Sequence, residues 1–125
     1  MKTTQEIEQF VSSYIQAALW SYVDDGDEPL DLNYDKDDLA PETLASMRLD
    51  CKAFIDVNGI PKYNDAQYTD AEKAGHDFWL TRCGHGVGFW DRAELSKQDQ
   101  DRLTEASNGF GNIDLYVSDD KICVM

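Results

Sequence analysis

The sequence has few basic residues. Lys and Arg together number 11 against 25 Asp and Glu, so the 125-residue chain carries a formal net charge of −14. Residues 1–62 carry 13 acids and 5 bases, and residues 63–125 carry 12 and 6, so the whole chain is acidic. Because nucleic acids and anionic lipids are themselves negative, this charge argues against direct binding to either and favours a basic partner.

Cysteine pairs and long apolar runs are also absent from the sequence. Cys51, Cys83 and Cys123 are odd in number and form no CxxC pair, unlike the dense, even set of a disulfide-stapled secreted domain. No stretch approaches the roughly 18 apolar residues of a membrane-spanning helix. The first ten residues have no apolar run of the signal-peptide type. We therefore expect a cytoplasmic protein with reduced thiols.

Four segments carry helix signals. The first runs over residues 4–24 and stops near Gly26; Thr3 and Glu6 have capping-box spacing, and apolar residues recur at i, i+3, i+4 and i+7. The others begin at Pro41, at Thr69, which has capping-box spacing with Glu72, and at Ser96. Asn58-Gly59 and Asn108-Gly109 mark two of the ends. These helices are expected over residues 41–58, from about residue 70 to Gly75, and over residues 96–106.

Two later segments carry hairpin signals. Residues 78–90 contain two β-prone runs around a glycine-rich turn, and residues 113–124 contain two around a polar turn. With 42% hydrophobic residues, the chain has enough apolar material for a core. The order of elements predicts an α+β fold, with three to four helices packed on a small antiparallel sheet made of two hairpins, in a single domain over residues 1–125.

The strongest local bias is an acidic stretch, with nine acids between Asp24 and Glu42 and Lys36 as the only base. One interpretation is a solvated loop that keeps the protein soluble. The other is a contact surface whose carboxylates resemble DNA phosphates and bind the basic groove of a nucleic-acid-binding protein, with an attraction that weakens in salt. For that surface we predict these contact residues: Asp24, Asp25, Asp27, Glu28, Asp31, Asp35, Asp37 and Asp38.

The same stretch contains a partial calcium-loop pattern. Positions 1, 3, 5, 7 and 12 of the pattern fall on Asp31, Asn33, Asp35, Asp37 and Glu42. Lys36 stands where such loops place Gly, and its ammonium would compete with the ion. We assign no metal site to the stretch, and cation binding by it stays open.

A further cluster suggests metal or nucleophilic chemistry. His76, Cys83 and His85 lie within ten residues, but structural zinc sites take four ligands, often in paired short spacings. In the alternative interpretation this segment is a packed hairpin whose glycines permit the turn and whose Phe78, Leu80 and Phe89 fill the core. We predict no catalytic residue and no cofactor.

In the packed-hairpin interpretation, charged pairs close the ends of the hairpin. Asp77 with Arg92, or Asp91 with Arg82, would form cross-strand ion pairs there. These residues then have a structural role.

Residues 74–122 contain the segments AGHDFWLTRCGHGVGFWDR and DRLTEASNGFGNIDLYVSDDKI. They resemble a family of small phage and mobile-element proteins with a GHDFWLTRxxHGxGFWDR-like motif. The resemblance implies a phage context and no particular chemistry. Cys83 stands where Asn is common in that family, which argues against an obligatory role for its thiol.

These observations predict a phage-type acidic binding protein in the host cytoplasm that is not an enzyme. It would inhibit a basic, nucleic-acid-binding defence protein of the host by DNA mimicry, without binding nucleic acid or membrane itself. One alternative is a structural or regulatory phage protein that acts as a homodimer or through an exposed Trp79 or Trp90. The second alternative is a small metal-dependent enzyme that uses His76 and His85.

Overall fold

A computed structural model describes residues 3–22, 28–84 and 86–124. Four α-helices dominate it: α1 (Thr4–Ser21), α2 (Pro41–Asn58), α3 (Asp70–Arg82) and α4 (Lys97–Phe110). One antiparallel pair of strands follows, β1 (Leu115–Ser118) and β2 (Lys121–Val124). Three single-turn 3₁₀ helices lie between them: η1 (Leu30–Leu32), η2 (Lys36–Asp38) and η3 (Phe89–Asp91). The fold is therefore mostly helical with a small sheet, as the α+β class predicts.

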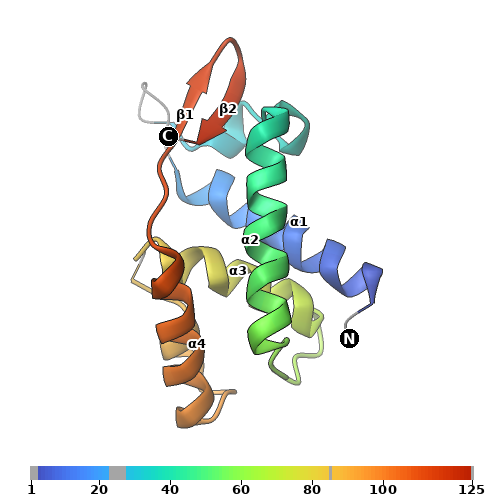
Figure 1. Ribbon diagram of the computed structural model, residues 1–125, viewed down its shortest axis with the longest axis vertical. Coiled ribbons are helices and arrows are strands. Elements are labelled where there is room, and N and C mark those ends of the chain that lie inside the picture. The colour runs from blue at the N-terminus through green and yellow to red at the C-terminus, as the bar shows by residue number, and fades with distance from the viewer. Residues whose placement is uncertain (1–2, 23–27, 85, 125) are drawn as a thin grey trace.

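The helices pack around one another, with the hairpin at one end (Figure 1). α1 packs most extensively on α3, and α2 crosses the face of α1. The hairpin lies beside the first turns of α2, whereas α4 lies toward the opposite end of the molecule. The connection between α1 and α2 runs along the hairpin end, because Leu39 pairs with Ile122 of β2 and the Ala40 N–H donates to the Ile122 carbonyl at 3.0 Å.

An aromatic cluster fills the core between the helices. Phe54 of α2 stacks on Phe78 of α3, with ring centroids 4.4 Å apart, and on Phe89 of η3 at 5.7 Å. Phe10 of α1 packs against both Phe54 and Phe78. All four rings are fully buried, which confirms the predicted burial of Phe78 and Phe89.

The C-terminal hairpin is confirmed. Leu115 pairs with Val124 and Ser118 with Lys121, which leaves a two-residue turn at Asp119 and Asp120. Both turn residues have positive φ, 52° and 60°, as the favoured two-residue hairpin turn requires, and Asp tolerates this conformation better than most residues.

The first predicted hairpin, over residues 78–90, is wrong, so the sheet has one hairpin and not two. The run Phe78-Trp79-Leu80 lies in α3, which does not end at Gly75 but continues to Arg82. The second run includes the 3₁₀ turn η3. Phe78, Trp79 and Leu80 are all at most 1% exposed. Because this part of the helix is buried on several sides, it lacks a polar face, and its apolar run has the pattern of a buried strand.

Two other predicted helix ends shift. α4 continues past Ala106 to Phe110 and is capped by Gly111, which has φ 78°, so Gly109 lies inside the helix. α1 ends at Ser21, a few residues before the predicted end at residue 24. The predicted stop at Gly26 lies outside the described residues.

The length and apolar character of the helices bear on whether any of them could span a membrane. Within residues 3–22, 28–84 and 86–124, none of them combines the length and the apolar character needed to cross a bilayer.

Candidate functional site

The acidic connection (residues 28–40) joins α1 to α2 and carries the predicted contact residues that the structure describes. Asp31, Asp35 and Asp37 are exposed and Asp38 is half-buried. Asp24, Asp25 and Asp27 lie outside the described residues. Glu28 stands at the start of the connection, where its Oε2 accepts from Asn33 Nδ2 at 2.9 Å.

Buried apolar residues hold the acidic connection on the body of the protein. Leu30, Leu39 and Ala40 are at most 6% exposed and belong to the buried apolar set, so both ends of the acidic run are anchored. Polar groups also order the run internally. The Asp35 carboxylate caps η2 by accepting a hydrogen bond from the Asp37 N–H at 2.9 Å. The Asp38 carboxylate accepts one from the Asp35 N–H, also at 2.9 Å. The exposed carboxylates therefore project from an ordered backbone.

Most bases in the described residues are paired with acids elsewhere in the chain. The ion pairs are Arg48–Glu8, Lys73–Asp65, Lys73–Glu94, Arg82–Asp50, Arg92–Asp77, Lys97–Asp101 and Arg102–Asp99. None of these pairs includes an acid of the acidic connection, and within the described residues Asp31, Asp35, Asp37 and Asp38 form no ion pair. Their charges are thus available to a partner.

The calcium-loop pattern does not form a metal site in this structure. Asp35 and Asp38 cap the η2 turn, and Asn33 turns toward Glu28. Among residues 3–22, 28–84 and 86–124, no group of three His, Cys, Asp or Glu side chains converges as metal ligands would. This absence of a ligand group holds for the described residues alone, and His85 lies outside them.

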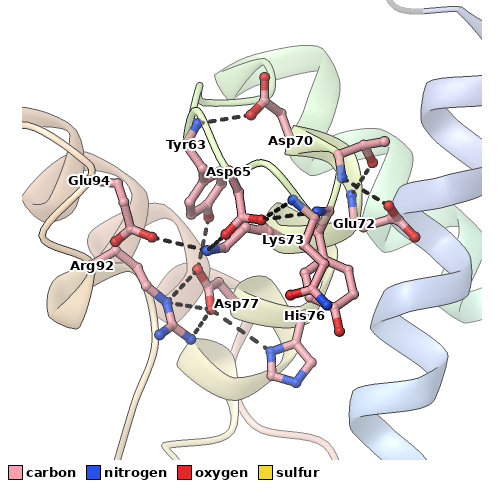
Figure 2. A network of polar contacts seen from close by, with 12 residues as sticks. Tyr63, Asp65, Asp70, Glu72, Lys73, His76, Asp77, Arg92 and Glu94 are labelled. Atoms are coloured by element: carbon pink, nitrogen blue, oxygen red, sulfur yellow. Dashed lines mark hydrogen bonds and ion pairs between the residues drawn. The ribbon is translucent and has the colours of Figure 1, made fainter.

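A second polar cluster surrounds Asp77 on α3, shown in Figure 2. Asp77 is 1% exposed. Arg92 donates to it in a fork, from Nε to Oδ2 at 2.9 Å and from Nη2 to Oδ1 at 2.6 Å. Tyr63 donates its hydroxyl to Oδ2 at 2.8 Å. The predicted Asp77–Arg92 pair is therefore confirmed, but it ties a helix to the segment after η3 and does not cross a hairpin. The alternative Asp91–Arg82 pair is wrong, because Arg82 pairs with Asp50.

The environment of Asp77 favours its charged form. Burial by itself would raise the pKa of this carboxyl, but contacts with His76, Arg92 and Tyr63 and the charge of Arg92 outweigh burial and lower the pKa. Burial and the neighbouring Asp77 carboxylate raise the pKa of the Tyr63 hydroxyl, so it stays protonated and donates. The cluster is a satisfied structural network.

Acid should therefore weaken the fold in part through Asp77. A carboxyl with a lowered pKa stabilises the fold above its unfolded pKa, about 3.9, and loses that contribution as the pH falls toward its folded pKa. We expect Asp77→Asn to cost about 2 kcal/mol at pH 7. The difference from the parent protein should shrink below about pH 4. Urea unfolding of both proteins from pH 7 to pH 3 measures it, and a difference that stays constant over that range contradicts the assignment.

His76 lies between two open grooves. It lines a groove of about 400 Å³ with Lys73 and Asp77, and a larger one of about 660 Å³ with Trp20 of α1. Its Nδ1 is 4.0 Å from Asp77 Oδ1, which is too far for a direct hydrogen bond. The enzyme alternative needs His85 as well, which the structure does not describe, so it stays a prediction.

Two of the three thiols, those of Cys51 and Cys83, lie in surroundings that disfavour nucleophilic chemistry. Cys51 is buried in the core and Cys83 is half-buried. Burial raises the pKa of both thiols, so they remain protonated near neutral pH.

Of the two tryptophans predicted as exposed, Trp90 is exposed and Trp79 is not. Trp79 is fully buried and donates its indole N–H to Ser21 Oγ at 2.7 Å, whereas Trp90 is 48% exposed. Trp20 of α1 is also exposed, at 58%. The sequence did not reveal that Trp20 of α1 and Tyr34 of the acidic connection line one groove with the acidic side chains. Their closeness along the chain to those acids was the one available signal.

The chain was compared with known proteins. No family model, no curated protein and no solved structure matches it. The phage context therefore remains a prediction from residues 74–122.

Proposed function

We propose that this chain is an acidic binding protein of phage type that acts in the host cytoplasm. It inhibits a nucleic-acid-binding protein of the host by occupying the basic groove that nucleic acid would fill. The observation that carries the proposal is the acidic connection, where Asp31, Asp35, Asp37 and Asp38 stand on an anchored, capped backbone without ion pairs among the described residues.

The order of these carboxylates favours a contact surface over the other interpretation, a loop that only keeps the protein soluble. Binding costs less conformational entropy when the contact groups are already held in place. The net charge of −14 adds a long-range attraction that speeds encounter with a basic protein and falls with ionic strength.

The proposal is tested by capture from a host extract on the immobilised chain at low salt. We expect retained proteins that bind nucleic acid, that leave the chain at about 0.5 M salt, and that added duplex DNA displaces. The triple variant Asp31→Asn, Asp35→Asn and Asp37→Asn should retain at least tenfold less.

A matched triple variant controls for total charge. Asp56→Asn, Asp91→Asn and Glu105→Gln remove three exposed acids from α2, η3 and α4. This control should retain the same proteins as the parent chain. Equal losses in the two variants, or a complex that resists both salt and DNA, would contradict the proposal.

A second candidate function is self-association, which an exposed apolar line on α2 favours. Leu49 is 69% and Val57 84% exposed, and Ala45 and Ala53 extend the same i, i+4 line. A second copy packed along it would bury these side chains. Because like charges repel at low salt, we expect a dimer in sedimentation at about 0.5 M salt and a monomer for Leu49→Lys. A monomeric parent chain at that salt concentration excludes this candidate.

A further inference from the structure

The larger groove lies between α1 and the acidic connection and has a volume of about 660 Å³. Ile15 and Leu19 of α1 contribute buried apolar side chains to its lining, and Trp20 adds an indole that is 58% exposed. On the other side the lining includes Tyr34 and the carboxylate of Asp31. The groove thus combines an open aromatic wall with negative charge.

We propose that this groove binds an arginine side chain of the basic partner. The inference rests on the proposed function, because it assigns a specific contact to the same acidic surface. Asp31, Asp35 and Asp37 all line the groove, and none of the three forms an ion pair within the described residues. A cation that enters would therefore meet three exposed carboxylates.

The aromatic wall indicates an organic cation. A cation over an indole face gains from the ring quadrupole, most strongly for Trp. His76 packs beside Trp20, with ring centroids 6.2 Å apart, and the Trp20 side chain stays 58% exposed, so the indole remains open to a ligand. A metal ion is the poorer candidate, because the described acids and histidine here do not converge as ligands.

Arginine fits this combination better than lysine does. The guanidinium is planar, so it stacks flat on an indole while its N–H groups still reach carboxylates in a fork. The lysine ammonium is a strongly hydrated point charge and gives up more solvation against an aromatic ring.

The positive charge of Lys36 should weaken the binding of a cation in this groove. Lys36 lines the groove together with Asp35 and Asp37, and its ammonium opposes an incoming cation. Replacing Lys36 with Gln should therefore tighten binding of the cation, by about twofold for an exposed charge.

A titration with short peptides tests the site directly. The probe is a capped glycine peptide with one central arginine, followed by the indole N–H resonances at low salt. We expect the Trp20 resonance to shift on binding. The matched citrulline peptide, which is neutral and nearly the same shape, should bind at least tenfold more weakly, and the lysine peptide about threefold more weakly.

Variants then assign the contact to the groove. Trp20→Ala should weaken arginine binding about fivefold or more, and Trp20→Leu, which keeps an apolar side chain without the ring, should weaken it as well. Trp90→Ala removes an exposed indole outside the groove and should leave the affinity within twofold. Unchanged binding in both Trp20 variants, or equal binding of the lysine or citrulline peptide, overturns the inference.

Failure of this inference can be told apart from failure of the proposed function. If Trp20→Ala still captures the host protein and the triple aspartate variant does not, the acidic surface binds without the arginine contact. If the triple variant also captures it, both proposals fail.

Discussion

Replacing Arg82 with methionine should destabilise the fold by about 3–5 kcal/mol, one of the two largest effects that we expect. The side chain is 2% exposed. Its guanidinium donates to Asp50 Oδ2 at 2.7 Å, to the Tyr14 hydroxyl at 3.1 Å, and to the carbonyls of Phe110 and Gly111 at 3.0 and 2.8 Å. Methionine fills much of the space but leaves these acceptors without their donor.

Arg82 also links elements that are distant in the chain. One guanidinium joins α3 to Tyr14 of α1, to Asp50 of α2 and to the end of α4, and it lies over the rings of Phe78 and Phe110. Lysine has no planar fork with which to reach these partners, so Arg82→Lys should recover little of the loss.

Urea unfolding measures the effect, with Arg102→Met as the matched control. Arg102 pairs with Asp99 on the surface of α4 and donates to the Asn58 carbonyl at 3.3 Å. Its side chain is 43% exposed, so its loss should change stability by less than about 1 kcal/mol. An Arg82→Met protein within 1 kcal/mol of the parent would show that the guanidinium is not the link that its contacts indicate.

Replacing Gly75 with alanine should destabilise the fold by about 3 kcal/mol. A Cβ at this position would lie 2.1 Å from the carbonyl oxygen of Phe10, so α1 and α3 would have to move apart. The displaced atom is backbone and cannot rotate away. A loss of stability would be informative, because replacing Gly with Ala inside a helix otherwise stabilises the fold by up to about 1 kcal/mol.

Gly109 is the matched control for this substitution. It lies inside α4, and a Cβ there would meet nothing within 4 Å. Gly109→Ala should therefore raise the free energy of unfolding, by about 0.5–1 kcal/mol. Thermal and urea unfolding compare the two variants, and a Gly75→Ala protein as stable as the parent would contradict the close helix crossing.

Local signals in the sequence predicted the helix starts well. Thr3 and Thr69 both form the capping boxes that their spacing with Glu6 and Glu72 predicts, and Ser96 caps α4. Pro41 stands at the start of α2. These features depend on residues three or four apart, so no tertiary contact is needed to recognise them.

Tertiary packing decides what the sequence could not show. Gly75 has the pattern of a helix end, but it lies inside α3 because a close helix crossing needs a residue without a side chain. Phe78-Trp79-Leu80 resembles a strand because its helix is surrounded by other elements.

The candidate site also has features that the sequence could predict and features that only tertiary contacts show. The charge of the acidic stretch follows from composition alone. Its anchoring through Leu39 and Ala40, and its placement opposite Trp20, depend on contacts between segments and were not predictable.

The central claim is that the acidic surface takes the place of nucleic acid on a basic protein. The most direct measurement loads host DNA-binding proteins onto immobilised duplex DNA at low salt, then adds the chain and assays which proteins are released. We predict that the chain releases a specific protein, that the triple aspartate variant releases at least tenfold less, and that the Asp56, Asp91 and Glu105 variant releases as much as the parent. No release by the parent chain, or equal release by the triple aspartate variant, would contradict the account.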